Sequence, residues 1–141
     1  MPVDVHREIA RREMADIQLI AKRYNWHLTQ TSSGLMYEIV NKHQGTMPTA
    51  GDMVTITGSI ATPAGVYVLD SHKDGAKTFQ VNRSDDFVGL HELVQLMHEG
   101  DSLNAIVPSF LAYGISGNGE KIAGATSLIC KIKLININKN N

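Results

Sequence analysis

The segment TSLICKIKLINI, residues 126–137, in which apolar residues and lysines alternate from Cys130 to Leu134, is the feature that most constrains the fold. Apolar side chains and lysines take alternate positions: Leu128, Cys130, Ile132 and Leu134 against Lys131 and Lys133. Successive side chains of a strand point to opposite faces, so the pattern gives one buried face and one face in water. The segment therefore predicts a strand of an antiparallel sheet.

Shorter runs with the same period of two predict the other strands of this sheet. The Ser32-Ser33-Gly34 triplet separates the first two runs, and Pro48 and Gly51 interrupt the chain before the third. The expected strands cover residues 26–31, 34–42, 52–60, 66–70, 78–81 and 101–107. The polar residues 71–77 are expected to form a loop.

A first helix is predicted over residues 4–24. Its apolar residues form a narrow stripe at helical spacing, and charged residues fill the rest of the surface. The stripe consists of Ile9, Ile17, Ile20, Ala21 and Tyr24. A stripe this narrow indicates a helix that docks on a surface rather than one that forms the core.

A second helix is predicted over residues 84–100. Ser84, Asp85 and Asp86 are favourable N-cap residues, and Gly100 is a favourable stop. Apolar residues repeat at i, i+3, i+4 and i+7: Leu90, Leu93, Val94 and Met97. The other side, expected to face water, carries His91, Glu92, Gln95, His98 and Glu99. Together the elements predict an α+β fold, with an antiparallel sheet wrapped around this helix and an extra N-terminal helix.

Length, charge and composition exclude several classes of protein. A chain of 141 residues is long enough to bury one core. The net charge is −1 and the sequence has no basic stripe, so it lacks the positive surface expected of a protein that binds nucleic acid. No run approaches the roughly 18 apolar residues of a membrane span. The single Cys130 cannot form an internal disulfide, and we expect it to be buried as a small apolar side chain.

The six histidines do not form a metal-binding pattern. His91 and His98 are seven residues apart, whereas two ligands on one helix usually stand at i and i+4. The sequence contains no paired-cysteine pattern, no GxSxG motif and no GxxxxGK[ST] loop. Neither a metal nor another cofactor is expected, and the histidines are expected to be solvated.

The segment PSFLAYGISGNGEKIAG, residues 108–124, combines loop-forming glycines with apolar side chains and a phenol. Such a loop either folds back over the core or forms the rim of a binding site. If the sheet curls around the second helix, an apolar cleft could gather Asp70, Phe79, Phe87, Tyr113 and Ile122. The alternative is that both phenylalanines belong to the core and that Asp70 caps a turn.

Several segments resemble the FKBP-type peptidyl-prolyl isomerases, over residues 33–137. The strongest are the helix pattern G-L-x-E-L-x-x-L-M-x-E-G-D at 89–101, the P-S-x-x-A-Y-G segment at 108–114 and the last strand. The details are most similar to the branch associated with gliding motility in Bacteroidetes. The resemblance implies an antiparallel half-barrel around one short helix. It divides the chain into an N-terminal helical extension with the first strand, 1–32, and an isomerase domain, 33–141.

The resemblance also implies the site residues. Tyr113 matches the family's loop tyrosine, Asp70 its pocket carboxylate, and Phe87 the residue whose backbone N–H binds a ligand carbonyl; these three are the implied catalytic residues. The implied substrate-binding residues are Ile56, Leu69, Phe79, Leu90, Ile122 and Cys130. Many relatives have aromatic residues at several of these positions and at Lys77, so the cleft is expected to be largely aliphatic. The loop after Tyr113 is expected to cover it as a flap.

The implied activity is isomerisation of X–Pro bonds in protein or peptide clients, without a cofactor. One alternative is a non-catalytic, chaperone-like module that binds peptides in a degenerate pocket. Another is a structural role, with the 4–24 helix mediating self-association. Proteins of the gliding-motility branch are commonly exported lipoproteins, so an envelope location is expected if a leader was removed, and a cytoplasmic one otherwise. The lipid-bearing cysteine is absent from this sequence, so membrane contact would need an anchor outside it.

Overall fold

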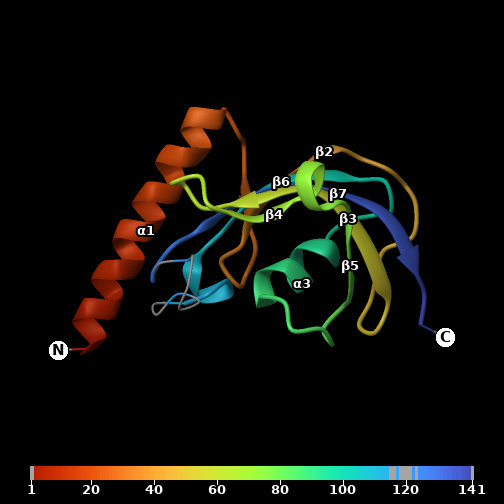
Figure 1. Ribbon diagram of the computed structural model, residues 1–141. Coiled ribbons are helices and arrows are strands. Elements are labelled where there is room, and N and C mark those ends of the chain that lie inside the picture. Colours follow the sequence, from red (N-terminus) through yellow and green to blue (C-terminus); the bar gives the residue numbers. More distant parts are fainter. Residues whose placement is uncertain (1, 115–116, 118–121, 123, 141) are drawn as a thin grey trace.

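The computed structural model describes residues 2–114, 117, 122 and 124–140. Its centre is an antiparallel sheet that curves around a short helix, α3, and carries a long helix, α1, at one end (Figure 1). The strands are β1 (Thr29–Gln30), β2 (Met36–Asn41), β3 (Met53–Ala61), β4 (Tyr67–Asp70), β5 (Lys77–Gln80), β6 (Ser102–Val107) and β7 (Leu128–Asn138). The helices are α1 (Pro2–Tyr24), α2 (Ser71–Asp74), α3 (Val88–Val94) and the 3-10 turn η1 (Ser109–Leu111). The predicted α+β fold is confirmed.

The sheet order is β1-β2-β6-β7-β3-β4, and β5 pairs with the other half of β3. The strand predicted from alternation, β7, lies in the middle and pairs with β6 on one side and β3 on the other. Its apolar residues face α3: Leu128, Cys130, Ile132 and Leu134 are all at most 3% exposed. The concave side of the sheet and the apolar side of α3 therefore form the main core.

The central helix is shorter than predicted. It runs from Val88 to Val94, and its N-cap is Phe87, which makes no side-chain capping bond. Ser84 and Asp86 are therefore not N-caps: the Ser84 hydroxyl donates to Asp86 Oδ2 at 2.6 Å, and the Ser84 N–H donates to Gln80 O. Because these loop residues satisfy one another, the helix begins only after them. Its expected stop, Gly100, has a φ of +99° in the following turn.

The expectation that His91 is solvated is wrong. His91 is 7% exposed and packs edge-on against Phe79, with ring centroids 5.6 Å apart. Its Nδ1 accepts from the Asn82 N–H at 2.9 Å, so its Nε2 carries the proton and donates to Ser84 O at 3.2 Å. The 82–87 loop folds back over this side of α3, which helical spacing alone does not reveal.

The polar segment after β4 also differs from the prediction. Residues Ser71–Asp74 form the one-turn helix α2 instead of a loop. Asp70 caps it, because Oδ1 accepts from the His72 N–H at 3.2 Å. Ser71 turns back to the sheet and its Oγ accepts from the Gly58 N–H at 2.8 Å. Capping by Asp70 fixes the path of the chain from β4 to β5.

The long helix α1 packs on the opposite face of the sheet from α3. Ile17 and Ile20 are buried against Ile106 of β6, whose neighbours in the strand point to the main core. Tyr24 stacks on Trp26 with centroids 4.7 Å apart, and Lys131 Nζ lies 4.5 Å from the Tyr24 ring centroid. The narrow apolar stripe predicted a docked helix, and in this chain it docks on the chain's own sheet.

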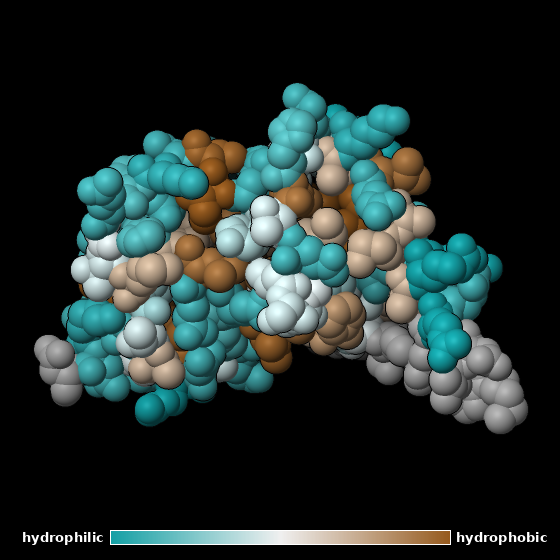
Figure 2. Space-filling model, turned by 180° about the vertical axis from the view of Figure 1, so that it is seen from behind, coloured by the Kyte–Doolittle hydropathy of each residue, from teal (hydrophilic) through white to brown (hydrophobic). Residues whose placement is uncertain are grey.

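Apolar residues on the surface are dispersed. The face seen in Figure 2 shows hydrophobic residues in small groups between hydrophilic ones. The most exposed large apolar side chains of the described residues, each more than half exposed, are Val5, Leu19, Val40, Tyr67, Val88 and Phe110. Scattered apolar groups are normal for a protein surface. No helix in the described ranges is long and apolar enough to cross a bilayer.

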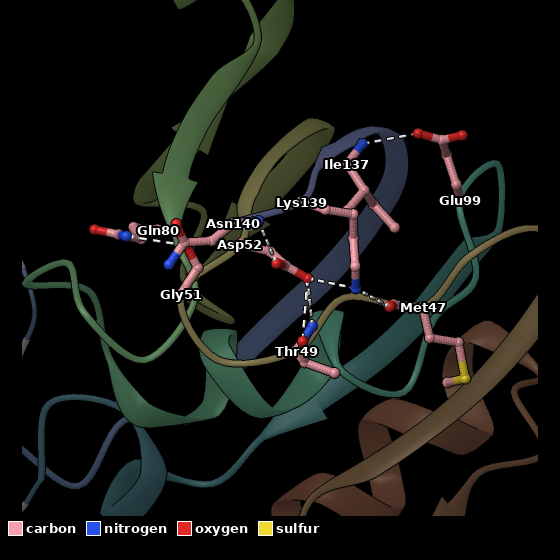
Figure 3. A network of polar contacts seen from close by, with 9 residues as sticks. All are labelled: Met47, Thr49, Gly51, Asp52, Gln80, Glu99, Ile137, Lys139 and Asn140. Atoms are coloured by element: carbon pink, nitrogen blue, oxygen red, sulfur yellow. Dashed lines mark hydrogen bonds and ion pairs between the residues drawn. The ribbon is translucent and has the colours of Figure 1, made fainter.

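The C-terminal residues are tied to the fold by a buried carboxylate (Figure 3). Asp52 is 2% exposed and accepts hydrogen bonds from Lys139 Nζ at 2.7 Å, the Asn140 N–H at 2.9 Å and the Thr49 N–H at 2.8 Å. The bond from Lys139 and those from the two N–H groups hold the pKa of Asp52 well below its usual range. The segment after β7 is therefore held against the rest of the fold by Asp52.

We expect Asp52→Asn to lower the Tm by several degrees at neutral pH. The new amide nitrogen cannot accept the bonds that Oδ2 receives from Lys139 and Thr49. A carboxyl whose pKa is depressed in the folded state stabilises the fold above its unfolded pKa of about 4 and loses that contribution as the pH falls below it. The Tm difference between the two proteins should thus shrink in scans below about pH 4. Asp16→Asn on α1 is the control, and an equal loss in both variants would contradict the prediction.

Candidate functional site

A cleft of about 430 Å³ opens beside the N-terminal end of α3. Its walls come from β3, β4, the end of α2 and the turn that follows it, β5, and α3 with the two residues before it. Tyr113, two residues after η1, completes them. The apolar lining consists of Ile60, Val68, Leu69, Phe87 and Leu90, with Ala76 at the turn. The polar lining consists of Asp74, Lys77, Asp86 and Tyr113. An apolar hollow with a few converging polar groups is the usual form of a ligand site.

Four of the expected site residues meet at this cleft. Leu90 comes from α3, Leu69 from β4, Phe87 from the N-cap of α3 and Tyr113 from the segment after η1. The Phe87 and Tyr113 rings are in contact, with centroids 5.7 Å apart and planes at 55°. Burial of the phenol, together with the charges of Asp86 and Asp85, raises the pKa of Tyr113. The Tyr113 O–H therefore remains a proton donor throughout the physiological range.

The two expected hydrogen-bond donors are available for a ligand. Among the described residues, none accepts a hydrogen bond from the Phe87 N–H or pairs with the Tyr113 hydroxyl. An unpaired donor beside an apolar wall costs free energy unless water or a ligand satisfies it. These two groups can thus bind oxygen atoms of an incoming chain.

An ion pair forms one side of the cleft. Lys77 Nζ lies 2.9 Å from Asp86 Oδ1, and the Ser84 hydroxyl donates to the other carboxylate oxygen. Burial alone would raise the pKa of Asp86, but the bonds from Ser84 and Lys77 outweigh it and lower that pKa. Asp86 is therefore ionised at neutral pH and holds the Lys77 ammonium in the wall.

Asp70, the carboxylate that the resemblance implies for the pocket, is the N-cap of α2. Its carboxylate caps α2, and it does not line the cleft. This matches the alternative that Asp70 caps a local turn. The carboxylates that line the cleft are Asp74 and Asp86, which the sequence analysis treated as a loop residue and an N-cap. Nothing in the sequence around Asp74 or Asp86 indicates that these two carboxylates line the same cavity.

Three of the expected substrate-binding residues lie in the core behind the cleft. Ile56 and Cys130 are fully buried and Phe79 is 3% exposed, and none of them lines the cavity. Burial raises the pKa of the Cys130 thiol, so this residue is an unreactive core side chain. Phe79 packs on His91 instead, as the alternative interpretation of the phenylalanines expected. Phe87, by contrast, reaches the cleft.

Ile122 is 4% exposed but is not among the cleft residues. The other residues of the expected flap, 115–116, 118–121 and 123, lie outside the described residues. The sequence analysis missed Ile60 and Val68. Ile60 follows from pairing, because it stands opposite Leu69 across β3 and β4. A register between these two strands would have placed Ile60 beside the cleft.

A second cavity of about 460 Å³ lies between α1 and the β3–β4 turn. It is slightly larger, but it contains no aromatic side chain and no buried ion pair. We take the α3 cleft as the candidate site because a ring contact, two hydrogen-bond donors and charged side chains meet there. In the described part of the chain, no group of three or more His, Cys, Asp or Glu could hold a metal ion.

The fold is shared with solved structures of peptidyl-prolyl isomerases. FkpA from Escherichia coli aligns with 94% of this chain and 62% of its own, with a TM-score of 0.78 and 20% identity. A peptidyl-prolyl cis-trans isomerase from Pseudomonas syringae aligns with 94% of this chain and 96% of its own, at the same TM-score and identity. At this identity the likeness establishes the fold class, a curved sheet around one short helix.

The sequence comparisons establish the family. The model of the FKBP-type peptidyl-prolyl cis-trans isomerase family matches residues 44–135, and the chain belongs to that family. It is 36% identical over 107 residues to a probable FkpA of Neisseria meningitidis, and 38% identical over 111 residues to the outer membrane protein MIP of Legionella longbeachae. Each alignment covers 76% of this chain but only 39% and 46% of those proteins, respectively. The chain thus spans less than half the length of either relative.

Proposed function

We propose that the α3 cleft binds proline-containing segments of proteins and catalyses cis–trans isomerisation of their X–Pro bonds. One observation carries the proposal: an apolar hollow of about 430 Å³ stands beside two donors, the Phe87 N–H and the Tyr113 O–H, that have no hydrogen-bond partner among the described residues. A proline ring can occupy the hollow, and the flanking carbonyls can accept from the donors.

No covalent step is needed for this reaction. The barrier to rotation is about 18–20 kcal/mol, because twisting the peptide bond breaks its resonance. A catalyst therefore only has to bind the twisted amide more tightly than the planar one. Leu69, Leu90 and Phe87 would remove water from the bond and so weaken the charge-separated resonance form that water favours. Tyr113 and the Phe87 N–H would hold the flanking carbonyls in the twisted geometry.

We expect Tyr113→Phe to lower kcat/KM for X–Pro peptides about fivefold, which corresponds to an ordinary hydrogen bond of ~1 kcal/mol. The ring contact with Phe87 can remain in this variant. Peptide isomerisation and proline-limited refolding should be measured side by side, with far-UV CD as a check on the fold. If Tyr113→Phe turns over the peptides as fast as the wild-type protein, Tyr113 has no part in the mechanism. If the wild-type protein is folded but accelerates neither reaction, a non-catalytic peptide-binding module is favoured.

The same assay separates two candidates for the carboxylate of the site. Asp70→Asn keeps an acceptor oxygen that can cap α2, whereas Asp86→Asn removes the charge paired with Lys77. A loss of turnover in Asp70→Asn would support the role implied by the resemblance. A loss confined to Asp86→Asn would move that role to the carboxylate that lines the cleft.

We also propose that the protein acts in the cell envelope on protein clients. The name of the Legionella relative, an outer membrane protein, supports this location. The P-S-x-x-A-Y-G segment and the N-terminal helix support a place in the gliding-motility-associated branch, with residues 1–32 as an extension of an isomerase domain, 33–141. Fractionation of the source cells, followed by detection with an antibody, tests the location. Recovery in the cytosolic fraction alone would exclude it.

A further inference from the structure

The segments that form the cleft concentrate negative charge. Residues 68–77 and 84–90 together contain four aspartates and two lysines, a net charge of −2. The whole chain carries −1, so the remainder of the molecule is slightly positive. Part of that positive charge, Lys131 and Lys133, lies on the outer face of β7, away from the core that α3 covers. The cleft is thus an acidic site on a nearly neutral protein.

The one lysine that lines the cleft does not cancel this charge for a ligand. Lys77 is paired with Asp86 at 2.9 Å, and the exposed fractions of the two side chains are 33% and 17%. Asp74, which also lines the cleft, makes no ion pair with any described cation, and neither does Asp85. Asp85 is exposed and adjoins Asp86 in the chain. Two carboxylates without an ion pair among the described residues are therefore close to a bound ligand: Asp74 lines the cleft, and Asp85 is near enough for its charge to act on Tyr113.

We propose that this cleft selects proline segments that carry a lysine or arginine next to the proline. The inference rests on the proposed function, since it concerns the substrate of the same site. The aliphatic stem of a lysine or arginine can pack on apolar lining such as Val68 while its charged end meets Asp74 or Asp85. An acidic residue at the same place would face both carboxylates and lose affinity.

The test compares peptides that differ only in the residue beside proline. Lys, Leu and Glu are placed before the proline in one series and after it in a second, and kcat/KM is measured at low salt. We expect Lys to exceed Glu about three- to tenfold in at least one series, with Leu between them, as partly exposed charge pairs allow. The ratio should shrink at about 0.5 M salt, because screening shortens the range of the interaction.

A double variant identifies the groups responsible. Asp74→Asn with Asp85→Asn should bring the Lys-to-Glu ratio close to one. Asp16→Asn, which removes one charge from α1 on the opposite face of the sheet, should leave the ratio as it is in the wild type. A wild-type ratio of one in both series, with the Leu peptide turned over well, overturns the inference and leaves the proposed function intact.

If no peptide is turned over, the proposed function fails but the inference is still decided by binding. The Kd values of the same peptides are then measured by fluorescence titration. A Lys-to-Glu preference of about three- to tenfold in Kd that disappears in the double variant supports the inference. Equal Kd values for the three peptides overturn it.

Discussion

Gly58→Ala is expected to destabilise the fold by about 3 kcal/mol or more. Gly58 lies in β3 with a φ of +119°, and a Cβ built on it would stand 2.0 Å from the Lys131 backbone oxygen in β7. That contact involves the backbone of the central strand, so no side chain can rotate to relieve it. Backbone strain costs about 1–3 kcal/mol at such positions, and displacement of the strand adds to it.

Urea unfolding followed by far-UV CD measures this loss, and Gly65→Ala is the matched control. Gly65 also has a positive φ, of +91°, but nothing lies within 4 Å of its built Cβ. Its substitution should therefore cost only the conformational strain, about 1 kcal/mol. Equal losses in the two variants would show that conformation, and not the close approach of β3 to β7, limits position 58.

Glu13→Ala is expected to release α1 from the sheet and to cost about 2–4 kcal/mol. Glu13 is 7% exposed, and its carboxylate accepts from both the N–H and the hydroxyl of Ser109, the latter at 2.7 Å. Alanine would leave two buried donors without a partner, and hydrogen bonds to a charged group are worth about 1.5–3 kcal/mol each. The apolar contacts of Ile17 and Ile20 with the sheet would then weaken with the helix.

Hydrogen exchange is the measurement for this prediction, because it reports on α1 separately from the sheet. Faster exchange within residues 10–24, with less change in β6 and β7, is the expected pattern. Glu8→Ala is the matched control on the same helix, since the described partners of Glu8 are the exposed Arg11 and Arg12. An unchanged exchange rate of α1 in Glu13→Ala would mean that apolar packing alone docks the helix.

The sheet and its buried face could be predicted because side-chain alternation is a local pattern with a direct spatial meaning. Cys130 and Ile132 are buried as the period of two required, and Leu90 and Leu93 of α3 are buried as the helical period required. These residues follow a rule that depends only on neighbours in the sequence. The fold class was therefore accessible before any coordinates.

The start of α3 could not be predicted, for the opposite reason. Capping residues such as Ser84 and Asp86 can satisfy a helix or one another, and only the tertiary path of the loop decides between them. The burial of His91 depends on the same loop, as does the presence of Asp86 at the cleft. The sequence thus predicted part of the apolar lining, Leu69, Phe87 and Leu90, but did not predict that Asp74 and Asp86 line the cleft.

The central position of β7 has a consequence for how the chain folds during synthesis. β7 follows the other described strands in the sequence, yet it joins β1, β2 and β6 on one side to β3, β4 and β5 on the other. Until it leaves the ribosome, β3 and β6 each lack the neighbour on one of their two edges, and unpaired strand edges promote association with other chains. Before β7 is synthesised, the other strands can therefore pair only as two separate groups, and β7 joins these groups into one sheet.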